Sequence, residues 1–285
     1  MYRERKIAVV VPAYNEEKLI GRTISTMPDF VDHIVVVDDA SKDTTVEIIR
    51  QHASSDSRVV SIVHEKNGGV GKAISTGYIW ARDNDADIAV VMAGDGQMDP
   101  DDLPALLDPV VDDKCDYGKG NRLFTGEAWK KIPRIRYLGN SALSLMTKIA
   151  SGYWHVADSQ TGYTALNRKA MHLLPLEEIY PRYGMPNDFL VTCNIYNMRV
   201  KDIPVKPVYN IGEKSGIRIF TIIFKLTFLM IHLFFKRMVQ KYIIRDFHPL
   251  IFFYVLGFLL LVLDLPLTVR MLYYFFETGR IPPIN

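Results

Sequence analysis

Residues 87–102 read DIAVVMAGDGQMDPDD, and the rest of the chain can be interpreted outward from them. The apolar run at residues 88–92 has the length of a buried strand and ends in small and acidic residues. Parallel strands deliver polar groups in this way to the carboxyl edge of a sheet, where ligands bind. Asp95 and Gln97 offer a carboxylate and an amide oxygen, hard ligands that suit Mg2+ or Mn2+. The alternative is an acidic loop that only begins the helix at Pro100.

The composition indicates one large domain with an apolar appendage. The chain has 285 residues, 48% hydrophobic and 23% charged, which excludes a disordered protein. A net charge of +2 is too small to predict a nucleic-acid partner, whereas the positive charge among apolar residues in the last quarter favours a membrane. Cys115 and Cys193 have no metal spacing, and the opening MYRERK leads straight into a strand. We therefore expect a reduced cytosolic setting without export.

Strand and helix candidates alternate before this stretch, and each strand ends in polar residues. The expected strands cover residues 6–11, 33–37 and 59–64, and the expected helices cover residues 15–27, 44–51 and 73–82. Asn15 is a candidate N-cap of the first helix. Short connections between such elements predict a parallel, right-handed α/β sheet covered by helices on both faces. The polar strand ends should therefore gather at one edge of the sheet.

Two further features of that edge suit a nucleotide. The turn GGVGK at residues 68–72 precedes a helix, so it would present backbone N–H groups and a positive dipole end to phosphate. A plain tight turn has the same pattern. Asp39 could accept hydrogen bonds from a nucleobase or ribose, whereas Asp38 could only cap the following helix.

Taken in order, these motifs resemble those of a known enzyme family. They are VVPAYNEE, VVVDDASKDTT, EKNGGVGKA and VVMAGDGQMDPDDL, followed by GKGNR at residues 118–122, DSQTG at 158–162 and GEKS at 212–215. Their succession is similar to that of family 2 glycosyltransferases, and within them the polyprenyl-phosphate sugar synthases, of which dolichol-phosphate mannose synthase is the best-known type. The resemblance implies a GT-A (Rossmann-like) fold. It also implies inverting transfer of a hexose, with mannose or glucose favoured, from a nucleotide sugar to a dolichyl or undecaprenyl phosphate.

The resemblance implies roles for individual residues in binding the donor. Pro12, Tyr14, Glu16 and Asp39 would hold the nucleoside, Gly71 and Lys72 would lie in the phosphate turn, Asp95 and Gln97 would hold the divalent metal, and Lys214 would lie in a loop over the donor phosphates. The family commonly has an acid two residues before Asp95, where this chain has Ala93. Loss of that carboxylate would weaken binding of metal or ribose. A catalytically weakened nucleotide-binding membrane scaffold is therefore one alternative function.

Four residues are candidates for catalysis: Asp95, Asp188, Arg122 and Arg136. The two arginines could be solvated surface charges. The resemblance instead places such arginines around the acceptor phosphate, which suits the guanidinium fork, and Ser141 would add a hydroxyl there. Asp188 is either an N-cap or an active-site carboxylate, and resemblance to the family's acidic pair favours the second. A membrane-attached transferase acting on a saccharide hydroxyl would need Asp188 as its base, and this is the other alternative function.

Residues 216–244 have the pattern of an amphipathic helix. Six polar residues fall within about 100° on a helical wheel, a narrow stripe opposite a wide apolar face: Arg218, Thr221, Lys225, His232, Lys236 and Gln240. A spanning helix would put Lys225 near the bilayer centre at a cost of roughly 2.5 to 3.5 kcal/mol. We therefore expect one or two helices in the membrane interface, with a packed hydrophobic arm in a homo-oligomer as the alternative.

Residues 249–269 form the most hydrophobic run, with the length of about 20 residues that a bilayer span requires. Basic residues precede the span and put the catalytic domain at the cytoplasmic face of the cell membrane by the positive-inside rule: Lys236, Arg237, Lys241 and Arg245. Family members often carry a second span after a segment like residues 281–285, so we expect a truncated or a single-span chain. The expected organisation is a catalytic domain at residues 1–215, amphipathic juxtamembrane helices at 216–246, and a transmembrane segment with a short tail at 247–285.

Overall fold

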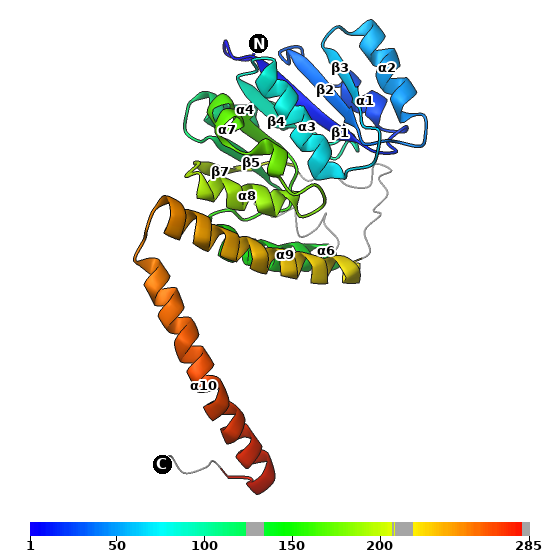
Figure 1. The fold of residues 1–285 in the computed structure, drawn as a ribbon. Coiled ribbons are helices and arrows are strands. Elements are labelled where there is room, and N and C mark those ends of the chain that lie inside the picture. Colours follow the sequence, from blue (N-terminus) through cyan, green and yellow to red (C-terminus); the bar gives the residue numbers. More distant parts are fainter. Residues whose placement is uncertain (124–133, 207, 209–218, 281–285) are drawn as a thin grey trace. The chain divides into compact units, whose positions relative to one another are not determined.

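The computed structural model describes residues 1–123, 134–206, 208 and 219–280, without the side chains of residues 134–138, 140 and 219–223. The chain forms two compact units, Met1–Arg237 and Met238–Asn285. The first unit contains a seven-stranded sheet with helices on both faces (Figure 1). The predicted α/β class is confirmed.

Four parallel strands form one half of this sheet, as predicted. In spatial order they are β3 (Val59–Val63), β2 (His33–Asp38), β1 (Ile7–Ala13) and β4 (Ile88–Val91). Their register aligns the carboxyl ends, because Ala13 pairs with Asp38 and Asp38 pairs with Val63. The polar residues that follow these strands therefore share one edge of the sheet.

The other half of the sheet is mixed. It continues from β4 through β6 (Thr164–Asn167) and β5 (Tyr117–Asn121) to β7 (Val200–Pro204). Strand β6 runs antiparallel to both of its neighbours, whereas β5 and β7 are parallel. The central Val-rich strands β1 and β2 are buried on both faces, as is usual in parallel sheets, whereas the edge strand β3 is only partly buried.

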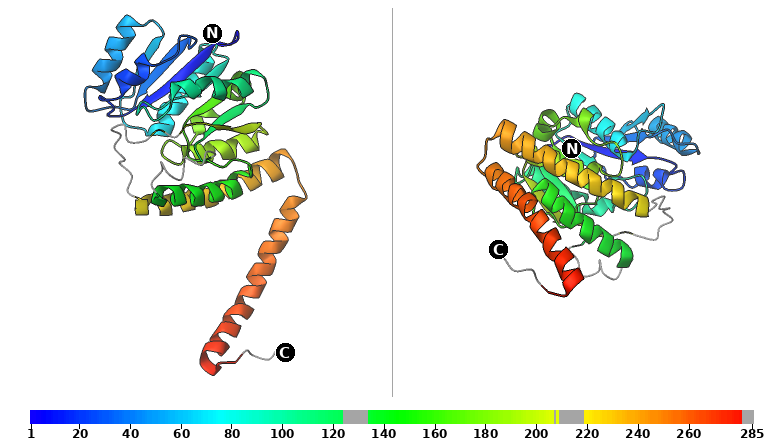
Figure 2. Two further views of the ribbon diagram at one scale, coloured as in Figure 1. Left: turned by 180° about the vertical axis from the view of Figure 1, so that it is seen from behind. Right: turned by 60° about the horizontal axis from the view of Figure 1, so that its bottom comes forward.

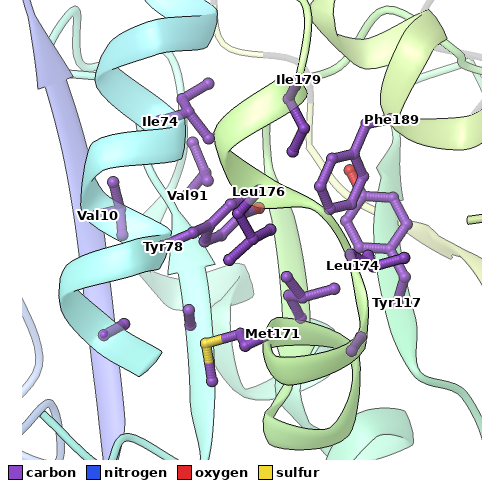
Figure 3. Close-up of a cluster of buried hydrophobic side chains, with 14 of the residues drawn as sticks. Val10, Ile74, Tyr78, Val91, Tyr117, Met171, Leu174, Leu176, Ile179 and Phe189 are labelled. Atoms are coloured by element: carbon purple, nitrogen blue, oxygen red, sulfur yellow. The ribbon is translucent and has the colours of Figure 1, made fainter. Parts of the chain in front are cut away.

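Two apolar cores lie on opposite faces of the sheet. One contains side chains of α1 (Ile20–Ser25), α2 (Thr45–Ser55) and α4 (Leu103–Val111), the last following the 3-10 turn Pro100–Asp102. The other contains side chains of α3 (Val70–Asp83), α7 (Arg168–Leu173), the 3-10 turn Leu176–Glu178 and α8 (Met185–Ile195). Figure 3 shows this second core, in which the rings of Phe189 and Tyr117 lie 4.9 Å apart and fix α8 against the sheet.

Helices α6 (Arg134–Ser151) and α9 (Ile219–Val239) lie side by side on one surface of the first unit (Figure 2). Met230 and Leu233 of α9 pack with Ala150 of α6 and with α8. The wide apolar face predicted for residues 216–244 is thus divided: one side of α9 packs on the domain, and another side is exposed. Large apolar side chains exposed on these helices are Leu145 and Ile149 of α6, and Phe224, Phe228, Ile231 and Phe235 of α9.

The second unit begins within the last turn of α9 and continues through a π-helical segment, Gln240–Arg245, to α10 (Leu250–Thr278). Among the described residues, α10 is the one helix that is long and apolar enough to cross a membrane. It contains the whole apolar run predicted as a span except its first residue, Pro249, and extends past it to Thr278. None of its most apolar window is buried in the protein.

The prediction of Asn15 as a helix cap is wrong, and of the two roles left open for Asp188 the structure excludes the N-cap. Asn15 does not cap α1, which begins five residues later, at Ile20. Instead Asn15 has a φ of 56°, and its Oδ1 accepts a hydrogen bond from Lys42 N at 2.8 Å, so it ties two loops together. Asp188 is not an N-cap either, because α8 begins at Met185 and places it in the first turn.

Candidate active site

Asp39, the residue after β2, holds the Gly-rich turn in place. Its side chain is only 3% exposed. Its Oδ1 accepts a hydrogen bond from Gly68 N at 2.8 Å, and its Oδ2 accepts one from Gly69 N at 2.7 Å. His64 Nδ1 lies 2.8 Å from Oδ1 and must be the donor, because a carboxylate only accepts. Three donors thus occupy most of the roughly four lone-pair positions of the carboxylate that was predicted to hold the nucleoside.

The segment around Tyr180 and Pro181 closes the other side of this turn. Lys72 N, in the first turn of α3, donates to Gly69 O at 2.9 Å and to Pro181 O at 3.1 Å. A Cβ atom on Gly71 would lie 2.3 Å from Tyr180 O, so this position requires glycine. The turn predicted to hold phosphate is therefore fixed between Asp39 and a distant segment that the motifs did not indicate. The Lys72 side chain is exposed.

Acidic side chains approach each other at the ends of β1 and β4. Pro12 is buried at the end of β1, Tyr14 is 42% exposed, and Glu16 is half-buried. Burial, together with the negative charges of Asp95 and Asp43, raises the pKa of Glu16 to about 7. Glu16 and Asp95 are therefore close enough to repel each other, which is a setting that a divalent cation would relieve.

Asp95 and Gln97 lie together in the loop after β4. Asp95 Oδ1 accepts a hydrogen bond from Gln97 N at 3.0 Å, which shapes the turn between them. Ala93 is half-buried, and its N–H contacts Met98 Sδ at 3.2 Å. Among the described residues, no group of three or more His, Cys, Asp and Glu side chains has the arrangement of a metal site. A cation here would need Asp95, the Gln97 amide and oxygen ligands from the substrate.

Arg122 follows β5 and is paired with a buried carboxylate. Its Nε donates to Asp158 Oδ2 at 2.8 Å, and its Nη2 donates to Asp158 Oδ1 at 3.2 Å. Burial would raise the pKa of Asp158, but the charge and hydrogen bonds of Arg122 outweigh it and lower that pKa. Gln160 N also donates to Asp158, and Gln160 Nε2 donates to Asn187 Oδ1 at 2.9 Å. A polar network thus joins Arg122 to the residue beside Asp188.

Asp188 is buried, with 3% of its surface exposed, and both of its oxygens accept hydrogen bonds. Oδ2 accepts from Tyr180 N at 2.9 Å, and Oδ1 accepts from Lys236 Nζ of α9 at 3.0 Å. Its place in the first turn of α8 also favours negative charge. Sequence reasoning did not identify Lys236 as a site residue, because its polarity and spacing assigned it to the polar stripe of α9.

Two further candidates, Arg136 and Ser141, belong to α6. Arg136 is in the first turn of this helix, and its side chain is outside the described part of the protein. Ser141 follows on the same helix and is half-buried. Lys214 lies outside the described residues.

The family model described as Glycosyl transferase family 2 matches residues 8–174. A UDP-N-acetylglucosamine–dolichyl-phosphate N-acetylglucosaminyltransferase of Methanococcus voltae is 32% identical over 72% of this chain and 87% of the relative. An undecaprenyl-phosphate mannosyltransferase of Micrococcus luteus is 28% identical over 70% of this chain and 82% of the relative.

The fold is also that of solved glycosyltransferase structures. Glucosyl-3-phosphoglycerate synthase from Mycobacterium tuberculosis, crystallised with Mn2+, UDP and its glucosylated product, superposes with a TM-score of 0.58 and 22% identity over 82% of this chain and 80% of that chain. This likeness confirms the GT-A fold. Together with the family match, it leads to the conclusion that the chain belongs to glycosyl transferase family 2 and is a nucleotide-sugar-dependent glycosyltransferase.

Proposed function

We propose that this protein transfers a hexose or N-acetylhexosamine from a nucleotide sugar to a polyprenyl phosphate, with inversion, at the cytoplasmic face of a membrane. The observation that carries the proposal is the contact between the candidate site and α9. Lys236 of α9 donates to Asp188, while Phe228 and Phe235 of the same helix are exposed. A lipid lying along this apolar surface would bring its phosphate to the site. The acceptors named for the two relatives, dolichyl and undecaprenyl phosphate, support the same acceptor class.

The donor would occupy the edge formed by β1, β2, β4 and the start of α3. The N–H groups of Gly68, Gly69 and Lys72 already donate to oxygens of the protein, so donor binding here would rest on a divalent cation. The close Glu16 and Asp95 carboxylates suit such a cation. Asp95 and Gln97 would hold that metal. When bound, Mg2+ or Mn2+ would neutralise the charge that develops on the departing diphosphate. The crystallisation of the structural neighbour with Mn2+ and UDP supports this assignment.

The acceptor needs little activation. A phosphate monoester has a second pKa of about 6, so at neutral pH it is mostly the dianion and already a nucleophile. The enzyme must instead bring two anions into line, which is a task for cations. Arg122, Arg136 and Ser141 would hold the acceptor phosphate. The Arg122–Asp158 pair would keep one guanidinium fixed in orientation.

Asp188 would orient a sugar hydroxyl or a cationic group rather than remove a proton. Its two oxygens already accept hydrogen bonds from Lys236 Nζ and from Tyr180 N. This arrangement favours a phosphate acceptor over a saccharide hydroxyl, which would require a general base.

The membrane arrangement follows from the two apolar surfaces. The exposed faces of α6 and α9 would lie in the interface, and α10 would span the bilayer. Of the four basic residues before the span, Lys236 and Arg237 bond to the domain itself. Lys241 and Arg245, in the π-helical segment, would then carry the positive-inside signal that supports a cytoplasmic catalytic domain.

The test is a screen of nucleotide sugars with the purified full-length protein in vesicles that contain a polyprenyl phosphate, with free saccharides as competing acceptors. We expect transfer from one nucleotide sugar to the lipid phosphate, and loss of that transfer on chelation of divalent metal. Transfer to a free saccharide without lipid would support a hydroxyl-directed transferase instead. Donor binding without turnover that Ala93→Asp converts into turnover would support the scaffold.

A further inference from the structure

The contact between Lys236 and Asp188 joins the juxtamembrane helix directly to the candidate active site. The Lys236 side chain is 26% exposed, and its Nζ reaches a carboxylate that is almost fully buried. The two residues come from α9 and α8. A buried carboxylate that loses its cation keeps a desolvated charge without compensation, so this pair has a large effect on how Asp188 is held.

Packing fixes where the lysine can reach. Leu233 and Met230, about one and two turns earlier on α9, lie in the cluster with α6 and α8. A Cβ atom on Gly184 would lie only 2.1 Å from Leu229 Cδ2, so α9 closely approaches the residue before α8. Arg237 Nη2 donates to Ile149 O of α6 at 3.1 Å. Lys236 therefore projects from a helix that is seated by apolar and polar contacts on both sides.

Asp188 connects α9 to the Gly-rich turn at residues 68–72 through the segment around Tyr180. Its Oδ2 accepts the hydrogen bond from Tyr180 N, and the next residue, Pro181, accepts one from Lys72 N. The residues just before Tyr180 are held by Leu176 and Ile179, which pack in the core that Figure 3 shows. A continuous set of contacts thus runs from α9 through Asp188 to the start of α3.

We propose that Lys236 is a positioning residue for transfer: it holds the Asp188 carboxylate and, through Tyr180 and Pro181, the phosphate turn, so that the site is complete only when α9 is seated on the domain. The proposal deepens the proposed function, on which its catalytic part rests. It makes the membrane-facing helix a part of the catalytic unit. Seating of α9 on the bilayer surface would then be coupled to the geometry of the site.

The experiment compares three variants of the full-length protein in vesicles of one composition. Lys236→Met removes the charge and the donor, Lys236→Arg restores both, and Lys225→Met removes an exposed charge from the same helix as a matched control. We expect Lys236→Met to lower kcat by about 10- to 100-fold, the loss typical of a displaced catalytic group, with little change in the KM of the lipid. Lys236→Arg should recover most of kcat, and Lys225→Met should keep it.

Hydrogen–deuterium exchange gives a readout that needs no substrate. Peptides covering residues 176–188 and 68–73 should exchange faster in Lys236→Met than in the wild type. In Lys225→Met, the same peptides should exchange at the wild-type rate. Unchanged exchange and kcat in a folded Lys236→Met protein would overturn the proposal. If that variant does not fold, Lys236→Gln replaces it, and equal kcat and exchange in the Gln and Arg variants would overturn the proposal as well. Faster exchange in a protein whose wild type transfers nothing to lipid phosphate would refute the proposed function while supporting the positioning role.

Discussion

Asp39→Asn tests whether this carboxylate holds the Gly-rich turn. The carboxylate accepts three hydrogen bonds, from Gly68 N, Gly69 N and His64 Nδ1. An asparagine has one acceptor oxygen, so its amide nitrogen must face at least one of these donors. A hydrogen bond to a charged group contributes about 1.5 to 3 kcal/mol, and we expect a loss of about 2 to 3 kcal/mol in the free energy of unfolding. For a chain of this size that corresponds to a fall in Tm of about 4 to 12 °C.

Asp38→Asn is the matched control, since it makes the same change at the neighbouring buried residue. Asp38 Oδ2 accepts a hydrogen bond from Ser41 N, but Oδ1 has no partner in the described part of the chain. An asparagine can keep the first contact and place its amide nitrogen at the second position. Thermal unfolding followed by intrinsic fluorescence in detergent would measure both variants. A Tm for Asp39→Asn within a degree or so of the wild type, or an equal loss in both variants, would refute the role given to Asp39.

Three further predictions concern the metal, acid stability and the membrane. Asp95→Ala should abolish metal-dependent binding of the nucleoside diphosphate without unfolding the chain, and calorimetry with and without Mn2+ would reveal an unchanged affinity if the assignment is wrong. Burial would raise the pKa of Asp116, but hydrogen bonds from Arg199 lower it from 3.8 to about 2. The ionised carboxylate therefore contributes about 2 kcal/mol to the free energy of unfolding above about pH 4, and this contribution is lost as the pH falls through 2. Asp116→Asn should flatten that acid dependence in unfolding experiments; an unaltered dependence would contradict it. A chain ending at Arg245 should still bind anionic vesicles in a salt-sensitive way, whereas a wholly soluble protein would contradict an interfacial α9.

The parallel half of the fold could be predicted because its signals are local. Each strand from β1 to β4 is a short apolar run that ends in polar residues, and the short connections leave few topologies. Strand β5, with the sequence YGKGN, nearly coincides with the short strand that the sequence predicts at residues 116–120. Lys119 in its centre is fully buried, with Nζ donating to Thr161 O at 2.6 Å, and burial lowers the pKa of Lys119 to about 8. The strand could be predicted locally, but the burial of its lysine could not, because it depends on the distant Thr161.

The sequence predicts candidate site residues but not the contacts they make. Asp39 and Asp188 are both candidates, and their hydrogen-bond partners lie far along the chain: Gly69 is 30 residues from Asp39, and Lys236 is 48 residues from Asp188. A helical wheel groups Lys236 with other polar residues, because it records spacing and not the surface against which the helix packs. The failure of Asn15 as a cap has the same origin, since its partner Lys42 belongs to another loop.

The most direct test of the central claim is phosphorus NMR of the lipid product. Vesicles containing a polyprenyl phosphate would be incubated with the protein, the diamagnetic cation Mg2+ and the nucleotide sugar selected by the screen. Attack by the lipid phosphate on the sugar predicts that the monoester resonance is replaced by that of a phosphodiester, with one sugar added for each monoester lost. Transferred sugar accompanied by an unchanged monoester signal would show that a hydroxyl was the acceptor and would contradict the account.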